Sequence, residues 1–431
     1  MEATKVLKKK KTLVPKLSFM GVDSTWQNMR YGDIYAFYTT NSFSRDNLNY
    51  QSGAVKNIHY GDIHKRFATL FDIQKEVVPF VNSEIEIKKI KEESYCQEKD
   101  LVIADASEDY ADIGKTIELV NLNNEKVIAG LHTFLARPNK HEMAKGFAGY
   151  LVQSWNFRKQ VMIIAQGTKV LSLSTNRLAN LKLTIPTLPE QKKIAFFLSA
   201  VDEKIQQLTR KKQLLEQYKK GVMQQLFTGK LRFKDENGKE FPEWEEKRFK
   251  DYVIDYRLGG NYKNTEEVTM YPLIKMGNLD RGKIKIDKLE YIPINQPIDS
   301  KDEIKYGDLF FNTRNTLDLV GKVAIWRNEL PKAYYNSNLM YLMFENNFFM
   351  NYRLNSFEGV KALKRFATGT TSVAAIYTKD LIKLELLIPC FEEQKKIANY
   401  LTNIDTKIES VTKQITQTQT FKKGLLQQMF V

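Results

Sequence analysis

Hydrophobic positions form two long stripes with helical spacing. The first stripe advances in alternating steps of four and three residues through Ile194, Leu198, Val201, Ile205, Leu208, Leu215, Val222 and Leu226. The second has the same spacing, through Ile397, Leu401, Ile404, Ile408, Val411, Ile415, Leu425 and Met429. Charged residues separate these positions, and 4,3 spacing sustained over this length is typical of a coiled coil. The pattern predicts two helices of roughly forty residues, each about 60 Å long.

The two helical segments are copies of one another. Residues 185–227 and 388–430 align without a gap, and 19 of 43 positions are identical. A repeat of this length indicates that one structural unit is used twice. Polar side chains interrupt both stripes, at Lys212, Lys219, Thr418 and Lys422. Because such helices are poorly suited to exist alone, we predict that the two copies pack on each other. Pairing with a helix of another protein is the alternative.

Short apolar runs separated by Gly and Asn turns fill much of the rest of the chain. Runs of this kind, rich in β-branched and aromatic residues, are typical of strands. The predicted strands include Leu101–Ala104, Val127–Ala129, Val161–Ile164, Leu309–Phe311, Val323–Trp326 and Leu339–Phe344. We therefore expect an α+β fold, with a mixed, largely antiparallel sheet and helices in each half.

The repeats divide the chain into four segments. We predict a first body at residues 1–185, a central repeat helix at 186–230, a second body at 231–388 and a C-terminal repeat helix at 389–431. Trp26 and Trp244 introduce the two bodies, whose sequences otherwise differ. A repeated frame with unlike contents suggests a pseudo-twofold protein with two different surfaces. Since a twofold protein meets two half-sites of duplex DNA about one helical turn apart, unlike surfaces predict a bipartite, asymmetric target.

The charge of the chain favours a polyanionic partner. The net charge is +15 and the sequence pI is about 9.3, which points to nucleic acid before an anionic membrane surface. The two cysteines, Cys96 and Cys390, provide neither a disulfide framework nor a zinc site, and they indicate a reducing compartment. We recognise no signal peptide, and apolar runs such as Leu339–Phe344 are too short to span a bilayer. We therefore expect a cytoplasmic protein.

No catalytic motif accompanies this charge. Gly114-Lys115-Thr116 is reminiscent of a phosphate-binding loop, but the glycine required five positions earlier is Asp109. A turn between strands is the better interpretation. A loop with the acidic residues Asp105, Glu108, Asp109 and Asp112 has Thr313-Arg314-Asn315 as its counterpart in the second half. We interpret it as a solvated loop, or as one that reads cytosine amino groups. The sequence predicts no catalytic residue and no metal site.

The repeated motifs resemble those of a known family. Both repeats begin with Glu-Gln-Lys-Lys-Ile-Ala, at Glu190 and Glu393, and both end with Lys-Lys-Gly and a Gln-Gln pair. Together with Trp26 and Trp244, these motifs resemble the specificity subunits of type I restriction-modification systems over essentially the whole chain. The resemblance implies two target-recognition domains separated by an antiparallel coiled coil of the two repeats.

The resemblance also implies the partners of the chain. A member of this family binds a split sequence in double-stranded DNA and holds two modification (methyltransferase) subunits and two restriction (translocase and nuclease) subunits. S-adenosylmethionine, ATP and magnesium are then expected in the partner subunits, and no cofactor is expected in this chain. This non-catalytic subunit would supply recognition and assembly.

Candidate DNA-binding residues are the Arg, Lys, Asn and His side chains on turn-rich loops of each body. Such side chains reach base edges in the major groove, and other basic groups neutralise phosphates. For each residue, a structural or merely exposed position is the alternative. The candidates are Arg45, Lys56, His59, Lys65, Arg66, His132, Arg137, Lys275, Asn278, Arg281, Lys283, Arg314, Asn315, Asn336 and Asn338.

The repeat helices supply the candidate assembly residues. These are Glu190, Gln191, Ile194, Leu198, Ile205, Gly221, Glu393, Gln394, Ile397, Leu401, Ile408 and Gly424. We expect the two glycines to permit close approach of the helices, because glycine inside a helix otherwise costs about 1 kcal/mol. A stand-alone DNA-binding or regulatory protein without enzyme partners is the alternative function. An enzyme would need a methyltransferase or nuclease motif, and we find none in the sequence.

Overall fold

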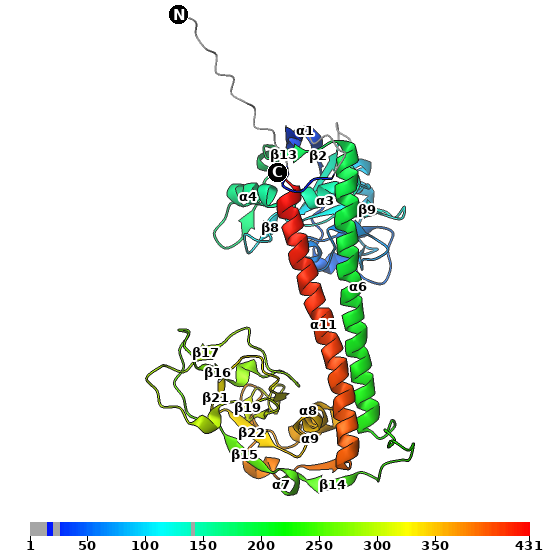
Figure 1. Cartoon of the computed structure of the whole chain (residues 1–431). Coiled ribbons are helices and arrows are strands. Elements are labelled where there is room, and N and C mark those ends of the chain that lie inside the picture. The colour runs from blue at the N-terminus through cyan, green and yellow to red at the C-terminus, as the bar shows by residue number, and fades with distance from the viewer. Residues whose placement is uncertain (1–14, 20–25, 139–142) are drawn as a thin grey trace, which may run out of the picture. The chain divides into compact units, whose positions relative to one another are not determined.

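Helices α6 (Leu188–Phe227) and α11 (Phe391–Met429) contain the two apolar stripes (Figure 1). The computed structural model describes residues 15–19, 26–138 and 143–431. Helix α6 has 40 residues and α11 has 39, and every predicted stripe position is buried or half-buried. The two long helices are confirmed.

The chain packs as two units, and each unit takes a part of both long helices. Unit 1 comprises residues 1–209 and 413–431, and unit 2 comprises residues 210–412. Unit 1 therefore joins the first part of α6 to the last part of α11, and unit 2 joins the last part of α6 to the first part of α11.

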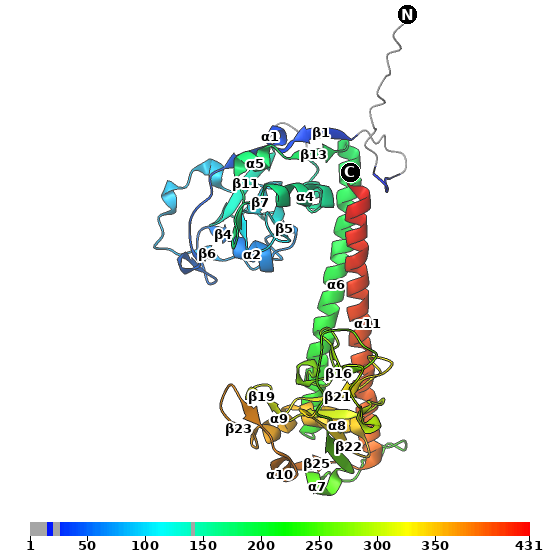
Figure 2. The same ribbon diagram turned by 90° about the vertical axis from the view of Figure 1, so that its left-hand side faces the viewer.

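Unit 1 is built on a mixed sheet of five strands in the order β2-β11-β7-β9-β5. Strands β11, β7 and β5 of this sheet are labelled in Figure 2. All neighbouring strands in it are antiparallel except β5 and β9, which are parallel. A second sheet has the order β10-β4-β6-β3. The strands are β1 (Gln27–Arg30), β2 (Tyr35–Tyr38), β3 (Leu48–Asn49), β4 (Lys56–Ile58), β5 (Leu70–Asp72), β6 (Phe80–Val81), β7 (Leu101–Ala104), β8 (Ala106–Ser107), β9 (Thr116–Asn121), β10 (Val127–Ala129), β11 (Thr133–Pro138), β12 (Leu171–Ser172) and β13 (Lys182–Ile185).

Helices cover both faces of the five-stranded sheet. The shorter helices of unit 1 are α1 (Tyr31–Ile34), α2 (Tyr60–Lys65), α3 (Phe147–Leu151), α4 (Trp155–Ile164) and α5 (Thr175–Ala179). Strand β7 is buried throughout, because Leu101 and Ile103 pack in a core with α3 and α4, whereas Val102 and Ala104 pack in a second core with α2. This alternation is the period-2 pattern of a strand with two buried faces.

One predicted strand of unit 1 is wrong. Residues Val161–Ile164 form the last turn of helix α4. The Ser154 side chain caps this helix by accepting a hydrogen bond from the Phe157 N–H, and Phe157 and Val161, four residues apart, are its buried positions. A run of four apolar residues does not distinguish a buried strand from a helix by its period alone, and here the cap and the i,i+4 spacing decide for helix.

Unit 2 contains an antiparallel sheet in the order β15-β22-β18-β20. Two three-stranded sheets accompany it, β17-β16-β21 and β19-β24-β23. The strands are β14 (Glu245–Arg248), β15 (Asp255–Leu258), β16 (Pro272–Ile274), β17 (Glu290–Tyr291), β18 (Leu309–Asn312), β19 (Arg314–Asn315), β20 (Val323–Ile325), β21 (Tyr334–Tyr335), β22 (Leu339–Met343), β23 (Thr368–Gly369), β24 (Ala374–Ala375) and β25 (Glu385–Ile388). The shorter helices are α7 (Phe249–Tyr252), α8 (Asn347–Asn355), α9 (Phe357–Lys364) and α10 (Thr378–Leu381). The remaining predicted strands are confirmed, and with them the α+β class.

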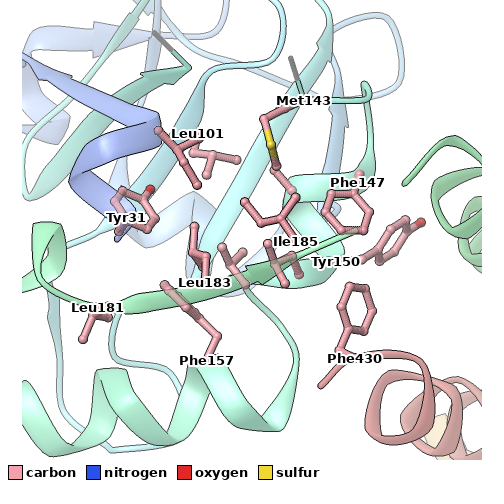
Figure 3. Close-up of a cluster of buried hydrophobic side chains, with 14 of the residues drawn as sticks. Tyr31, Leu101, Met143, Phe147, Tyr150, Phe157, Leu181, Leu183, Ile185 and Phe430 are labelled. Carbon is pink, nitrogen blue, oxygen red and sulfur yellow. The ribbon is translucent and has the colours of Figure 1, made fainter. Parts of the chain in front are cut away.

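Each unit closes its core with the end of one long helix. In unit 1, Phe430 lies edge-on to Trp26, with ring centroids 6.2 Å apart. It also lies against Phe147, with centroids 5.8 Å apart (Figure 3). In unit 2, Phe227 makes the equivalent contacts with Trp244 and Phe349, at 6.4 and 6.0 Å. The tryptophan that introduces each body is thus a packing residue for a helix terminus.

Candidate nucleic-acid interface

A Tyr–Asp–Lys group attaches the body of each unit to its long helices. In unit 1 the Tyr150 hydroxyl donates to Asp202 at 2.9 Å, and Lys422 Nζ lies 2.7 Å from the same carboxylate. In unit 2 the corresponding group is Tyr352, Asp405 and Lys219, with distances of 2.7 and 2.6 Å. Burial, and then the neighbouring aspartate, raise the pKa of both tyrosines, so both remain neutral donors.

This attachment explains two of the polar interruptions in the apolar stripes. Lys219 and Lys422 are half-buried and bound to an aspartate of the other long helix within the same unit. Each lysine also lies over the ring of the tyrosine in its group, 5.1 and 5.3 Å from the centroid. In unit 1, residue 422 lies beside residue 202 and residue 430 beside Trp26 at the start of the body, so the helix segments within the unit run antiparallel.

The Glu-Gln pair at the start of each repeat forms a second attachment. The Gln191 amide donates to the Pro186 carbonyl at 3.0 Å and accepts from the Ala144 N–H at 2.9 Å. Gln394 repeats this geometry, donating to the Pro389 carbonyl at 3.0 Å and accepting from the Tyr252 hydroxyl at 2.9 Å. These glutamines hold the turn before each long helix and one segment of the body.

In unit 2, Glu393, the glutamate next to Gln394, also joins the long helix to the body. Its carboxylate accepts from the Trp244 indole N–H at 3.0 Å and from the Arg232 guanidinium at 2.9 Å. The counterpart Glu190 is also buried, and burial raises its pKa while the nearby Trp26 indole opposes the rise. A buried carboxylate requires donors of this kind to remain charged.

Eight predicted assembly residues are therefore internal to their own unit. Their side chains are buried, so the structure gives them the role of joining a body to a helix: Glu190, Gln191, Ile194, Leu198, Glu393, Gln394, Ile397 and Leu401. Ile205 and Ile408 are half-buried. The expectation for Gly221 and Gly424 is wrong, because a Cβ added at either position meets no atom within 4 Å. Neither glycine is required for close helix approach.

Three predicted DNA-binding residues of unit 1 are held by their own domain. Arg137 forms a bidentate ion pair with buried Asp100 and also donates to two backbone carbonyls. Lys56 pairs with Glu125 at 2.5 Å. His59 caps α2 by accepting from the Gly61 N–H at 3.1 Å, and burial, followed by the charge of Arg45, lowers its pKa to about 4. These contacts within the domain favour a structural role over DNA binding for these three residues.

The other four candidates of unit 1 lie around helix α2. Arg45 is exposed but oriented by a bidentate pair with Asp62, both distances being 2.8 Å. Arg66 donates to the Tyr50 hydroxyl at 2.9 Å, and Lys65 is exposed without a partner among the described residues. His132 lies edge-on to Tyr60, which sits at the start of α2. The structure thus places these four residues on helix α2 or beside it.

Three candidates of unit 2 are likewise structural. Asn278 is buried and bonds to the backbone of residues 275, 285 and 288, which closes a loop. Lys275 pairs with Glu290 at 2.8 Å. Asn336 is buried and accepts from the Asn338 N–H at 3.2 Å.

The remaining candidates of unit 2 fall in two places. Arg281 and Lys283 lie on the loop after Asn278, where Arg281 is half-buried and Lys283 is exposed. Arg314, with Asn315 beside it on β19, lies next to Asn338, and a pocket of about 290 Å³ is lined by Leu258, Thr313, Arg314, Ser337, Asn338, Ala375, Ile376, Tyr377 and Thr378. The prediction from sequence missed Ser337, Tyr377 and Thr378, which carry no basic or amide group to mark them.

Features that imitate catalytic sites are structural. Gly114 has a φ of +69° and turns the chain into β9, and Lys115 Nζ donates to the His64 carbonyl at 2.7 Å. The phosphate-loop interpretation is thereby excluded and the turn confirmed. Among the described residues, no three His, Cys, Asp or Glu side chains are grouped to hold a metal ion. Within the same part of the chain, no helix has the length and apolar character needed to cross a membrane.

Comparison with known proteins assigns this architecture. A family model for the type I restriction modification DNA specificity domain matches residues 23–217 and again residues 242–419. The putative MjaX specificity subunit of Methanocaldococcus jannaschii, a type I restriction enzyme subunit, is 30% identical over 212 residues, which are 46% of this chain and 49% of that protein. The MjaVIII specificity subunit of the same organism is 28% identical over 276 residues, or 61% of this chain and 64% of that protein. The chain thus spans about half to two thirds of these relatives.

A solved structure has the same fold. The S subunit of the type I restriction-modification system from M. genitalium gives a TM-score of 0.57 at 14% identity, and the alignment covers 97% of this chain and 99% of that one. The specificity-domain model matches the chain twice, once over each of the two unlike α+β bodies, so the chain is a duplicated DNA-specificity protein. The chain belongs to the type I restriction modification DNA specificity domain family.

Proposed function

We propose that this chain recognises a bipartite, asymmetric sequence in duplex DNA, with one half-site for each unit, and that it scaffolds the modification and restriction subunits of a type I complex. The observation that carries the proposal is a repeated frame with unlike contents. Both units use the same Tyr–Asp–Lys group and the same Glu-Gln start. Their exposed loops carry different side chains.

Exposed apolar side chains on the long helices support the scaffolding role. Phe196 and Phe421 in unit 1 are 78% and 54% exposed, and Leu214 and Tyr218 in unit 2 are about half exposed. Large apolar side chains grouped on a surface mark protein–protein interfaces. We propose that modification subunits cover these helix faces, with the restriction subunits joining the complex that results.

The test is adenine-methylation mapping of DNA from cells that produce this chain together with a cognate modification subunit. Cells without this chain are the control. We expect a new split motif with two unlike halves around a fixed gap. Replacing residues 252–387 with the body of a relative should change one half of the motif and leave the other half and the gap intact.

Absence of methylation would contradict the proposal, provided that the modification subunit is shown to be bound to this chain. Sequence-specific DNA binding that is unaffected by a modification subunit would instead favour a stand-alone DNA-binding protein. A body swap that altered both halves would argue against one half-site for each unit.

A further inference from the structure

Each unit has a backbone junction at the end of a central strand, and the two junctions are built in the same way. In unit 1 the Asp105 N–H donates to the His132 carbonyl at 3.1 Å, and the Asp105 carbonyl accepts from the Leu173 N–H at 2.9 Å. In unit 2 the Thr313 N–H donates to the Asn338 carbonyl at 3.4 Å, and the Thr313 carbonyl accepts from the Ile376 N–H at 3.0 Å. Three chain segments therefore meet in the same way in both units.

The residues that follow these contacts also correspond. Ala106 and Arg314 begin the short strands β8 and β19, which pair with β12 and β24. Ser174 and Tyr377 are the N-cap residues of α5 and α10. We define junction 1 as Asp105, Ala106, His132 and Ser174, and junction 2 as Thr313, Arg314, Asn338 and Tyr377.

The two junctions carry side chains of opposite charge, at neighbouring positions: Asp105 corresponds to Thr313, and Arg314 corresponds to Ala106. Junction 1 presents the Asp105 carboxylate, 3.3 Å from His132 Nδ1, and the imidazole is 51% exposed. Junction 2 presents a guanidinium and an amide, and neither the Arg314 nor the Asn338 side chain has a hydrogen-bond or ionic partner among the described residues. Both line the 290 Å³ pocket, whose rim includes Tyr377, a ring that is about half exposed.

The Arg314 and Asn338 side chains have no partner among the described residues and are available for a ligand, and the Asp105 carboxylate, which His132 contacts, is partly exposed. A guanidinium donates two hydrogen bonds to O6 and N7 of guanine, an amide bonds to adenine N6 and N7, and a carboxylate accepts from the amino group of cytosine. Most other candidates, such as Arg137 and Asn278, have their bonding capacity taken up inside the domain.

We propose that the two junctions are the principal base-reading positions, and that junction 2 selects a guanine through Arg314 whereas junction 1 selects an amino-bearing base, cytosine first, through Asp105. This inference rests on the proposed function and makes it specific, because it assigns the difference between the half-sites to four equivalent positions. Asn338 extends junction 2 to a neighbouring base. His132 orients the Asp105 carboxylate.

The test uses the full chain with its modification subunit and compares Arg314→Ala with Lys283→Ala. Lys283 is an exposed cation of the same unit outside the junction. We expect Arg314→Ala to relax one base position in one half-site, with about 10- to 100-fold loss of discrimination, since a bidentate base contact is worth about that factor. Lys283→Ala should lower methylation of all target sites alike and leave the motif unchanged, as expected for a phosphate contact.

Two further variants sharpen the result. Arg314→Gln should shift the relaxed position toward adenine, because glutamine bonds bidentately to adenine. Asp105→Asn should alter one position of the other half-site only. The purified variants are checked by thermal unfolding, and both residues are partly exposed, so small changes in stability are expected.

Three results would overturn the inference. The first is an unchanged motif in both Arg314 variants. The second is a uniform loss of methylation at all sequences, which would make Arg314 a phosphate or assembly residue. The third is a change in both half-sites from a single substitution. A wild-type chain that directs no methylation at all would instead overturn the proposed function, so the two failures are distinguishable.

Discussion

At the scale of single residues, burial decides what a polar side chain does in this protein. Glu118 lies on β9, is buried, and accepts hydrogen bonds from the Gly146 and Gly149 N–H groups at 2.5 and 2.7 Å. Desolvation outweighs these bonds and raises the pKa of Glu118 to about 7. In the unfolded chain the carboxyl has its ordinary pKa, so folding takes up a proton between these two values.

Unit 1 should therefore lose stability as the pH rises from about 5 to 8. In this window the folded state binds more protons than the unfolded state, so the free energy of unfolding falls with pH. We expect wild type to lose roughly 3 kcal/mol relative to Glu118→Gln across the window, since one pKa unit corresponds to about 1.4 kcal/mol. The measurement is thermal unfolding of both proteins at several pH values. A control, Glu98→Gln at an exposed ion pair with Lys145, should give curves parallel to wild type; parallel curves for Glu118→Gln would contradict the shift.

The internal partners of single polar side chains could not be predicted from the sequence. Arg137 and Arg314 are both arginines near the ends of strands, yet the first is bound to Asp100 and the second has no partner among the described residues. A sequence shows the donors but not whether an acceptor lies inside the fold. Asp105 shows the converse, because its place beside His132 depends on a backbone junction that no local pattern reveals.

At the scale of elements, the long helices were predictable and the short ones were not. A 4,3 pattern that persists over forty residues has few alternative structures. The run Val161–Ile164 was ambiguous because four residues are too few to show a period, and these residues lie in α4. The polar interruptions at Lys219 and Lys422 are defects in a stripe but attachment points in the structure.

Gly221 and Gly424 lie inside the long helices and lead to a stability prediction. Open space surrounds the position of an added Cβ at both residues. Each change to alanine should raise the free energy of unfolding by about 1 kcal/mol, because alanine loses less backbone entropy in a helix. Urea unfolding monitored by helical circular dichroism measures the effect. Gly146→Ala is the matched control and should destabilise, since Gly146 has a φ of +86°; destabilisation by the two helix variants would refute the argument.

At the scale of the whole molecule, the first body depends on a helix segment that is distant in sequence, and the second does not. Unit 1 needs residues 413–431, whereas unit 2 is one continuous segment, residues 210–412. Lys422 supplies the partner of Asp202, and Phe430 closes the core against Trp26 and Phe147.

A chain shortened to end at Thr412 should therefore lose order in unit 1 only. Loss of a buried phenylalanine alone costs about 3–5 kcal/mol. We expect amide hydrogen exchange to become at least about ten-fold faster in the segment around Tyr150 and in the first turns of α6. Exchange in the strands β18 and β22 should be unchanged, and these strands serve as the internal control. Equal acceleration in both units would show that they do not fold as separate units.

The split composition of unit 1 also fixes the order in which the protein matures during synthesis. The ribosome produces most of unit 1 first, but the last helix segment of that unit follows the 203 residues of unit 2 (210 to 412). At about 5–20 residues per second, this delay is about 10–40 seconds. During that interval the nascent first body exposes the apolar surface that Phe430 later covers, and unit 2 has all of its residues before the last segment of unit 1 is made. The part of the chain that is translated first is thus the last to be completed, and it is the part with the greatest need for a chaperone.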